Sequence, residues 1–253
     1  MFRVSAKELF LWLKDDASKR DNKESLYLLI DLLGGISKQD LNSLRIDSSK
    51  EIYLKQDIRK LNSYWNDFIN KEIPIQYLCG YTYWRDLKLK VSRDVLIPRR
   101  ETEQIADIVV DICRLKKKVL YADLGTGSGA IAIAIAISNK NWHGLATDID
   151  SKALNVANEN FQRLCKTSNI KFYCGNWWKP LVNYAGKIDI AISNPPYIPS
   201  KVYEGLSTSV KKYEPEIALK GGEDGLRHLD QIIKFAPKFL KKGGWLILEN
   251  HFD

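Results

Sequence analysis

The sequence predicts an α/β fold: a parallel sheet covered by helices on both faces, preceded by a small helical domain and a β-hairpin linker. Three observations support this prediction. From about residue 99, short apolar runs alternate with amphipathic stretches, the pattern of strands and helices in parallel sheets. Before residue 74, apolar residues recur at helical spacing. Between these regions the apolar period changes to two.

Residues 1–73 are predicted to form the helical domain. One stripe begins near Phe2, a second ends at Gly34-Gly35, a plausible C-cap, and a third covers residues 51–72 before Pro74. The apolar positions that define the first and second stripes are Phe2, Ala6, Leu9, Phe10 and Leu13, then Leu26, Leu29, Ile30 and Leu33.

Residues 74–98 are predicted to form the linker. The stretch from residue 75 to 97 is interpreted as extended, because Leu87, Leu89 and Val91 alternate with polar residues. Gly80 and Arg85-Asp86 are candidate turns. We therefore expect a small hairpin between the two domains.

Residues 99–253 are predicted to form the α/β domain. A helix capped by Thr102 should run to about Leu115, with Ile105, Ile108, Val109 and Ile112 facing inward. The alternating run at 130–137 has the period of a strand, but its position after a glycine loop favours a buried helix. Strands are expected at residues 119–123, 143–148, 170–174, 188–193 and 244–249, and further helices at 151–166 and 225–240.

Composition limits the possible functions. Lys and Arg number 39 against 31 Asp and Glu, a formal charge of +8, but these charges are scattered and favour a solvated surface. The four cysteines form no C-x-x-C pair and no His/Cys cluster has metal-ligand spacing, so neither a disulfide framework nor a metal site is expected. Charges at Lys7, Glu8 and Lys14 argue against a signal peptide, and no apolar run approaches about 20 residues. A reduced, cytoplasmic protein is expected.

A glycine loop at residues 123–129 follows the first strand of the predicted sheet. Its glycines allow close backbone approach to a ligand, and the helix after it offers free N–H groups. Asp148 ends the next strand and can accept hydrogen bonds from a ribose diol. This unit predicts nucleoside binding. Gly125, Gly127 and Ala130 also match the dinucleotide fingerprint, so at this point a nicotinamide enzyme remains an alternative.

The segment Asn194-Pro195-Pro196-Tyr197 directly follows the fourth predicted strand, at the carboxyl end where ligands bind in open α/β sheets. The two prolines leave carbonyl acceptors fixed in direction, and Asn194 adds an amide oxygen. Together they suit the two N–H bonds of a planar –NH2 group, on which Tyr197 can stack. Such a site would hold a weakly nucleophilic nitrogen against a methyl donor, whereas hydride transfer has no use for it.

These two motifs resemble the class I methyltransferases that modify planar nitrogens. Three further segments are similar to the release factor glutamine methyltransferases, the HemK/PrmC family. These are Pro74-Ile75-Gln76-Tyr77-Leu78-Cys79-Gly80, residues 95–103, and Tyr213-Glu214-Pro215 followed by Ala218-Leu219 and residues 222–226. The resemblance, which runs from about Ile75 to Glu249, implies a Rossmann-like class I sheet and transfer of a methyl group from S-adenosyl-L-methionine to N5 of the glutamine in the Gly-Gly-Gln motif of peptide chain release factors.

The resemblance also implies roles for individual residues. Asp148 would bind the ribose, Trp177 would flank the adenine, and Asn194 would touch both cofactor and substrate amide. The methionine part of the cofactor would lie on Gly125, Thr126, Gly127, Ser128 and Gly129, and the substrate nitrogen on Asn194, Pro195, Pro196 and Tyr197. Separately from the resemblance, residues 1–73 are expected to recognise the body of the protein substrate, because the nitrogen site alone cannot distinguish one glutamine from another.

The sequence departs from the family pattern at two positions and at its end. Arg100 stands where proline is usual, and Asn176 where an acid often contacts the adenine amine. The chain ends at Asp253, after the fifth strand, so we expect the family's C-terminal strand pair to be missing and stability and turnover to be low. An adenine-N6 methyltransferase acting on DNA or RNA, or a truncated cofactor-binding protein without turnover, are the alternatives. We expect a monomer, with no direct nucleic-acid readout and no membrane association.

Overall fold

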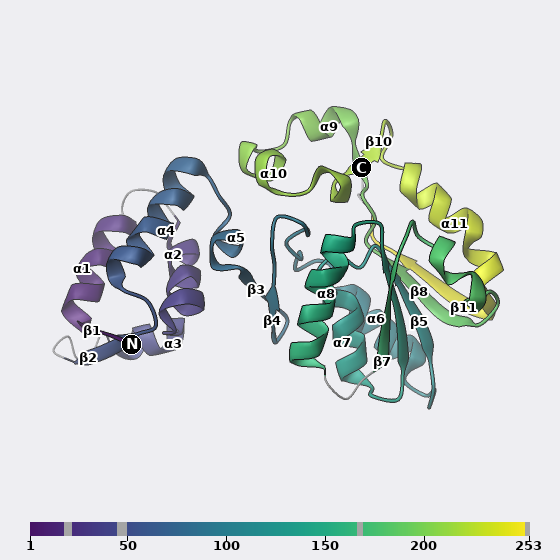
Figure 1. Cartoon of the computed structure of the whole chain (residues 1–253), viewed down its shortest axis with the longest axis horizontal. Helices are drawn as coiled ribbons and strands as arrows, with labels where there is room; N and C mark the ends of the chain where they lie inside the picture. Colours follow the sequence, from purple (N-terminus) through teal and green to yellow (C-terminus); the bar gives the residue numbers. More distant parts are fainter. Residues whose placement is uncertain (18–21, 45–49, 166–168, 251–253) are drawn as a thin grey trace. The chain divides into compact units, whose positions relative to one another are not determined.

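The computed structural model describes residues 1–17, 22–44, 50–165 and 169–250. The chain divides into two compact units, Met1–Tyr81 and Thr82–Asp253. Figure 1 shows the first unit in purple and blue, built mainly of helices, and the second in teal to yellow, built around a sheet.

The first unit packs helices and a two-stranded sheet around a core of its own, which includes Leu9, Leu29, Leu61 and Trp65. Strand β1 pairs antiparallel with β2. The elements in chain order are β1 Phe2–Ser5, α1 Ala6–Ala17, α2 Lys23–Leu29, the π-helix η1 Ile30–Gly34, α3 Lys38–Leu44, β2 Glu51–Leu54, α4 Ile58–Lys71 and α5 Ile75–Cys79.

The prediction of helix at Phe2 and from residue 51 was wrong, because each stripe begins with a strand. In Glu51–Leu54 the buried Ile52 and Leu54 alternate with exposed residues, which is a period of two rather than 3.6. Helix α4 begins after Asp57, whose carboxylate accepts the N–H of Arg59 at 2.8 Å, and it ends before Pro74. Gly35 has the left-handed conformation expected of a C-cap, with φ 77°.

The linker hairpin is present but shorter than expected. Strands β3 Tyr81–Trp84 and β4 Leu87–Lys90 pair through a turn at Arg85-Asp86. Ile75–Cys79, expected to be extended, is helix α5, which starts after Pro74 and buries Ile75 and Cys79. These two residues are four apart and therefore share one face of a helix.

The second unit contains a sheet of five strands in the order β11-β8-β5-β6-β7, in which all neighbouring strands are parallel. This confirms the α/β prediction. The strands are β5 Leu120–Leu124, β6 His143–Asp148, β7 Asn169–Cys174, β8 Ile188–Ser193 and β11 Leu240–Leu248; the main helices are α6 Glu103–Cys113, α7 Ala130–Ser138, α8 Ser151–Leu164 and α11 Arg227–Phe239. Residue 166, the expected end of the third of these helices, lies outside the described residues.

Helices cover both faces of this sheet. In Figure 1, α6, α7 and α8 lie on one side, and α11 lies on the other with the 3-10 helix η2 Lys179–Tyr184. Neighbouring strand residues contribute to different cores, since Tyr121 packs with α7 and Ala122 packs with Ile232 of α11. Residues 130–136 are all buried, so α7 is apolar on every side. The inward prediction for Ile108 was wrong, because this side chain is 44% exposed.

A smaller layer lies between β8 and α11 in the sequence. Glycines allow the backbone of this layer to approach the segment after β8: a Cβ atom at Gly221 would lie 2.7 Å from Tyr197 Cα, and one at Gly225 would clash with the Tyr197 carbonyl oxygen. The elements of the layer are β9 Ile198–Pro199, α9 Ser200–Glu204, α10 Thr208–Tyr213, the 3-10 helix η3 Glu216–Ala218 and β10 Lys220–Gly222, with β9 and β10 paired in parallel.

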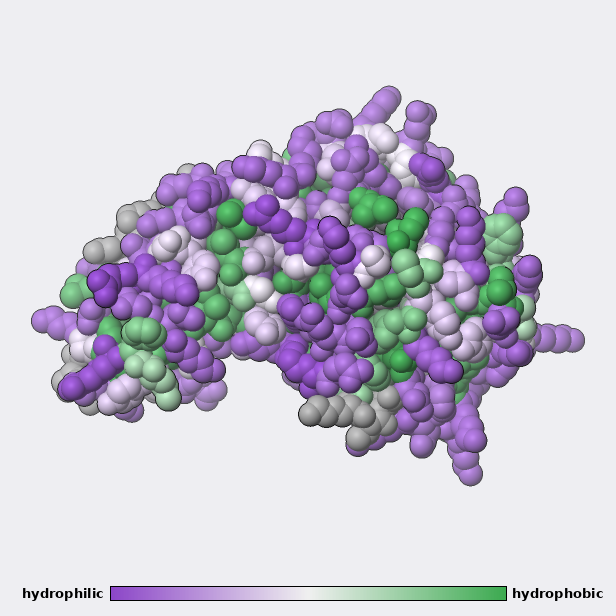
Figure 2. Space-filling view, viewed as in Figure 1, coloured by the Kyte–Doolittle hydropathy of each residue, from purple (hydrophilic) through white to green (hydrophobic). Residues whose placement is uncertain are grey.

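The face of the protein shown in Figure 2 is mainly polar. On the face shown in Figure 2, hydrophilic residues cover most of the protein and hydrophobic residues form scattered groups, in agreement with the high content of charged residues. None of the helices in the described part of the chain combines the length and apolar character needed to cross a membrane.

Candidate active site

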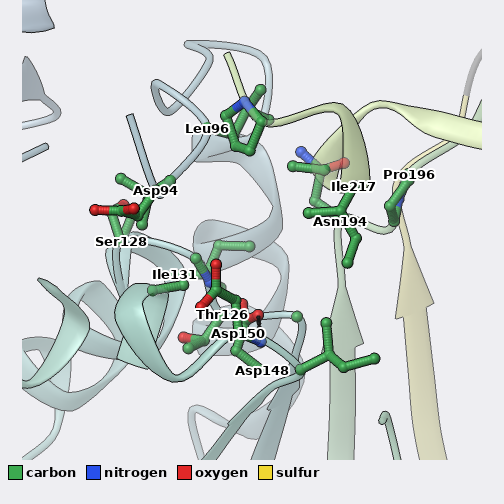
Figure 3. A pocket seen from close by; sticks show the side chains of 18 of the residues that line it. Asp94, Leu96, Thr126, Ser128, Ile131, Asp148, Asp150, Asn194, Pro196 and Ile217 are labelled. Atoms are coloured by element: carbon green, nitrogen blue, oxygen red, sulfur yellow. Dashed lines mark hydrogen bonds between the residues drawn. The ribbon is translucent and has the colours of Figure 1, made fainter. Parts of the chain in front are cut away.

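A pocket lies where the order in which the chain adds strands to the sheet reverses. The chain runs outward from β5 to β6 and β7, then returns to β8 on the other side of β5. The loops after β5 and β8 therefore diverge above neighbouring strands and leave a crevice at the carboxyl ends of the strands. The pocket is lined by the glycine loop, the segments after β6, β7 and β8, residues 94–102 and residues 215–218 (Figure 3).

The glycine loop requires conformations that favour glycine. Gly125, Gly127 and Gly129 have φ values of 75°, 54° and 82°. The N–H groups of Gly125 and Thr126 both donate to the Thr147 carbonyl, at 2.9 and 2.8 Å, which holds the loop against the end of β6. A Cβ atom at Gly127 would meet no described atom within 4 Å, so this part of the loop faces open space where a ligand can approach.

Asp123, near the end of β5 just before the glycines, holds the loop through a hydrogen bond with Thr126. Its side chain is fully buried and accepts the Thr126 hydroxyl at 2.6 Å through Oδ2. Burial raises the pKa of Asp123 to about 6, although the Thr126 hydrogen bond acts in the opposite direction. Its Oδ1 atom is buried without a hydrogen-bond partner among the described residues. The motif thus carries a carboxyl group that is costly to bury in its charged form.

Asp148 points its carboxylate toward the same loop. Oδ2 accepts the N–H of Gly127 at 2.9 Å and Oδ1 accepts the N–H of Asp150 at 3.0 Å. Burial raises the pKa of Asp148, opposed by the Asp150 and Gly127 hydrogen bonds. Figure 3 shows Asp148 beside Thr126 and Asp150 at the pocket. Each carboxylate oxygen keeps further acceptor capacity, which suits a ligand with two neighbouring hydroxyls.

Trp177 and His228 line another part of the pocket. Trp177 has φ 49°, an uncommon value for a bulky residue, and its ring lies 2.9 Å from the position of a Gly125 Cβ atom. The Trp177 and His228 rings meet edge to face, with 5.6 Å between centroids. Trp177 Nε1 and His228 Nδ1 are buried with no partner in the part of the chain described. Burial lowers the pKa of His228, which favours its neutral form.

The Asn194–Tyr197 segment is fixed by contacts to three other parts of the unit. Before it, the Ser193 hydroxyl donates to the Leu124 carbonyl at 2.6 Å, which joins the ends of β8 and β5. Asn194 Nδ2 donates to Thr102 Oγ1 at 3.1 Å. The Tyr197 hydroxyl donates to Glu249 Oε1 at 3.2 Å, and burial together with Glu249 raises the pKa of Tyr197 to about 12.

The pocket brings together most of the residues singled out in the sequence. Those that line it are Gly125, Thr126, Gly127, Ser128, Asp148, Trp177 and Asn194, with Pro196 and Asn176. Gly129, Pro195 and Tyr197 belong to the same two motifs, but the lining formed by the described residues does not include them. A stacking role for Tyr197 stays a prediction. Within the ranges the structure covers, no cluster of three or more His, Cys, Asp or Glu side chains is placed to bind a metal ion.

Sequence reasoning missed an ion pair beside the pocket. Arg99 Nη2 donates to Glu214 Oε1 at 2.7 Å, and the Glu214 side chain is only 2% exposed, against 39% for Arg99. This pair joins the 94–102 segment to the 215–218 segment, and both line the pocket. The residues of both motifs were visible in the sequence, but their separation of 115 positions gave no signal that they pair.

Sequence reasoning also missed Asn160, a fully buried polar residue on α8. Its Oδ1 accepts the N–H of Lys90 at 2.6 Å, and its Nδ2 donates to the carbonyls of Lys90 and Ser128, both at 2.9 Å. Asn160 therefore ties β4 of the hairpin to the end of the glycine loop.

The chain matches the family described as a methyltransferase domain over residues 115–252, more than half of its length. It is 40% identical over 252 residues to the release factor glutamine methyltransferase of Prochlorococcus marinus, covering 98% of this chain and 86% of that protein. Identity to the proteins of the same name is 38% in Synechocystis sp., covering 86% and 75%, and 41% in Bacillus cereus, covering 70% and 64%. The chain is an enzyme of the methyltransferase class and belongs to the release factor glutamine methyltransferase family.

Proposed function

We propose that the protein transfers a methyl group from S-adenosyl-L-methionine to N5 of the glutamine in the Gly-Gly-Gln motif of peptide chain release factors. One observation carries this proposal: Asn194, the glycine loop and Asp148 line one pocket at the ends of neighbouring strands. The names of the curated relatives support the choice of a release factor as substrate.

The pocket residues fit this cofactor. Gly125 and Gly127 offer backbone without side chains to the pocket, and Asp148 has acceptor capacity for a ribose diol. The rings of Trp177 and His228, which meet edge to face, give the lining an aromatic part that can pack against a nucleobase. When bound, S-adenosyl-L-methionine supplies an electrophilic methyl group on a sulfonium.

The protein's part in catalysis is positioning. A carboxamide nitrogen is a weak nucleophile because its lone pair is delocalised into the carbonyl. We infer that Asn194 Oδ1 and the Pro195 carbonyl accept the two N–H bonds of this nitrogen and orient it toward the methyl group. This positioning lowers the reaction barrier, so no strong base has to deprotonate the nitrogen beforehand. Tyr197 is not a candidate base, since its raised pKa keeps the phenol protonated and its hydroxyl donates to Glu249. The surplus proton leaves after the nitrogen has been alkylated.

We propose that residues 1–73 recognise the release factor as a whole. A pocket for one carboxamide cannot distinguish the correct glutamine from any other, so a second surface is required. The first unit has its own core around Leu9 and Trp65, which allows it to act as a separate recognition module. Removing residues 1–73 should abolish methylation of intact release factor and leave cofactor binding nearly unchanged. Equal turnover by the shortened chain would restrict this segment to a role in stability.

The proposed function is tested with a radiolabelled methyl donor. The protein is incubated with a release factor, with the same factor carrying Ala at the Gly-Gly-Gln glutamine, and with duplex DNA. Label should appear only on the unaltered factor, and Asn194→Ala should reduce it strongly while leaving a measurable residual rate. Label on the DNA would instead support an adenine methyltransferase, and label on the altered factor would mean that another residue is the acceptor.

A further inference from the structure

Thr102 uses its hydroxyl in an unexpected way. It precedes α6 and was expected to cap this helix, but its side chain makes no cap hydrogen bond to the described first turn. Its backbone has helical values, φ −64° and ψ −17°, rather than the extended conformation usual at a helix N-cap. The residue is only 4% exposed. The Thr102 hydroxyl therefore does not cap α6, and its hydrogen-bond partner lies in another part of the chain.

The partner of this hydroxyl is Asn194. Asn194 Nδ2 donates to Thr102 Oγ1 at 3.1 Å, across 92 positions in the sequence. An amide carries its oxygen and its NH2 on opposite sides of one carbon, so holding the NH2 at Thr102 turns Oδ1 away from it. Both residues line the pocket. Figure 3 shows Asn194 near Pro196 and Ile217, apart from Thr126 and Asp148.

The orientation of the Asn194 amide decides what the pocket can bind. With the oxygen presented, Asn194 accepts an N–H of an incoming –NH2 group. With the amide rotated by a half turn, two NH2 groups would face each other and neither could accept. The bond from Asn194 Nδ2 to Thr102 Oγ1 corresponds to the first of these orientations.

We propose that Thr102 is a positioning residue that fixes the Asn194 amide so that Oδ1 accepts the substrate carboxamide. The proposal rests on the proposed function, because it takes a carboxamide nitrogen to be the methyl acceptor. Thr102 acts through Asn194 and contributes no proton transfer. Its effect therefore falls on turnover, while the binding of cofactor and of the release factor body stays as it is.

Three variants of the full chain test this role. Thr102→Val preserves the shape and removes the hydroxyl, so kcat should fall roughly five- to ten-fold while KM for the release factor stays within about two-fold. Thr102→Ser keeps the hydroxyl and should restore kcat. In an Asn194→Ala background, Thr102→Val should cause no further loss, because the residue through which it acts is gone. Thr82→Val is the matched control: Thr82 is equally buried at 4%, its hydroxyl bonds to the Tyr83 carbonyl, and it is not among the described residues that line the pocket.

A second readout needs no release factor. In ¹⁵N-labelled protein, the Asn194 side-chain NH2 signals are those lost in Asn194→Ala. Thr102→Val should shift them, Thr102→Ser should restore them, and Thr82→Val should leave them unchanged. Unchanged signals or an unchanged kcat in Thr102→Val would overturn the proposal, as would equal losses in both Asn194 backgrounds. If the wild-type protein methylates no release factor, the proposed function fails, and the amide signals still decide whether Thr102 holds Asn194.

Discussion

Replacement of Asp148 tests the assignment of the nucleoside site most directly. Its two carboxylate oxygens accept the N–H groups of Gly127 and Asp150 at 2.9 and 3.0 Å, which fixes their direction. Each oxygen can still accept one hydroxyl of a ribose. Asp148→Ala removes these charge-assisted bonds, and we expect a loss of about 1.5–3 kcal/mol in binding free energy, or about 10- to 150-fold in Kd.

The assay is isothermal titration calorimetry with S-adenosylhomocysteine, which cannot react. Asp148→Asn retains one oxygen acceptor and should fall between wild type and Asp148→Ala. Asp189→Ala is the control, because Asp189 also accepts a backbone N–H, that of Leu120 at 2.9 Å, and is not among the described residues lining the pocket. Unfolding without ligand shows whether each variant is folded. If a folded Asp148→Ala protein binds as tightly as wild type, Asp148 does not bind the ribose.

Three further predictions concern stability. The raised pKa of Asp123, about 6, means that the native state binds more protons than the unfolded state between about pH 4 and 6. Stability should therefore fall by about 3 kcal/mol as pH rises through this window, and Asp123→Asn should remove the fall in urea titrations; equal pH slopes would contradict this. Glu214→Gln should lower stability by about 1–2 kcal/mol, since it weakens the bond to a partly exposed Arg99, and an unchanged denaturation midpoint would disprove this contribution. Gly129→Ala should destabilise more than Gly127→Ala, by about 1–2 kcal/mol, because only at Gly129 would the new Cβ lie 3.1 to 3.3 Å from described neighbours. Equal melting temperatures for the two variants would refute this reasoning.

The sequence predicted the sheet and the pocket well because both follow from local signals. Parallel strands end at the same edge, so a glycine loop after one strand and an acid after the next must lie close together. This reasoning placed Gly127 and Asp148, which are joined by a hydrogen bond. The buried helix at residues 130–137 was also predicted, but only from its position after the loop, because its alternating pattern is that of a strand.

The missed features depend on partners far along the chain. The strand Phe2–Ser5 exists because Glu51–Leu54 pairs with it, and nothing in its own residues shows that pairing. Ile75–Cys79 was too short for its helical period to be distinguished from an extended stretch. Thr102 was correctly placed before a helix, but capping is the local use of a threonine there, and its bond to Asn194 is a tertiary one. Sequence patterns predict what a residue does for its own element better than what it does for another.

The hydrogen bonds of Asn160 restrict which amino acids its position tolerates. The site on α8 is fully buried, so by burial alone it would accept leucine or valine. However, the surrounding groups require an acceptor for the Lys90 N–H and Arg163 Nη2, and donors for the carbonyls of Lys90 and Ser128. Aspartate lacks the donors, and aliphatic side chains lack both the donors and the acceptor. In a library of all substitutions, this interior position should behave like a ligand-binding residue, with its identity nearly fixed and hydrophobic replacements among the worst.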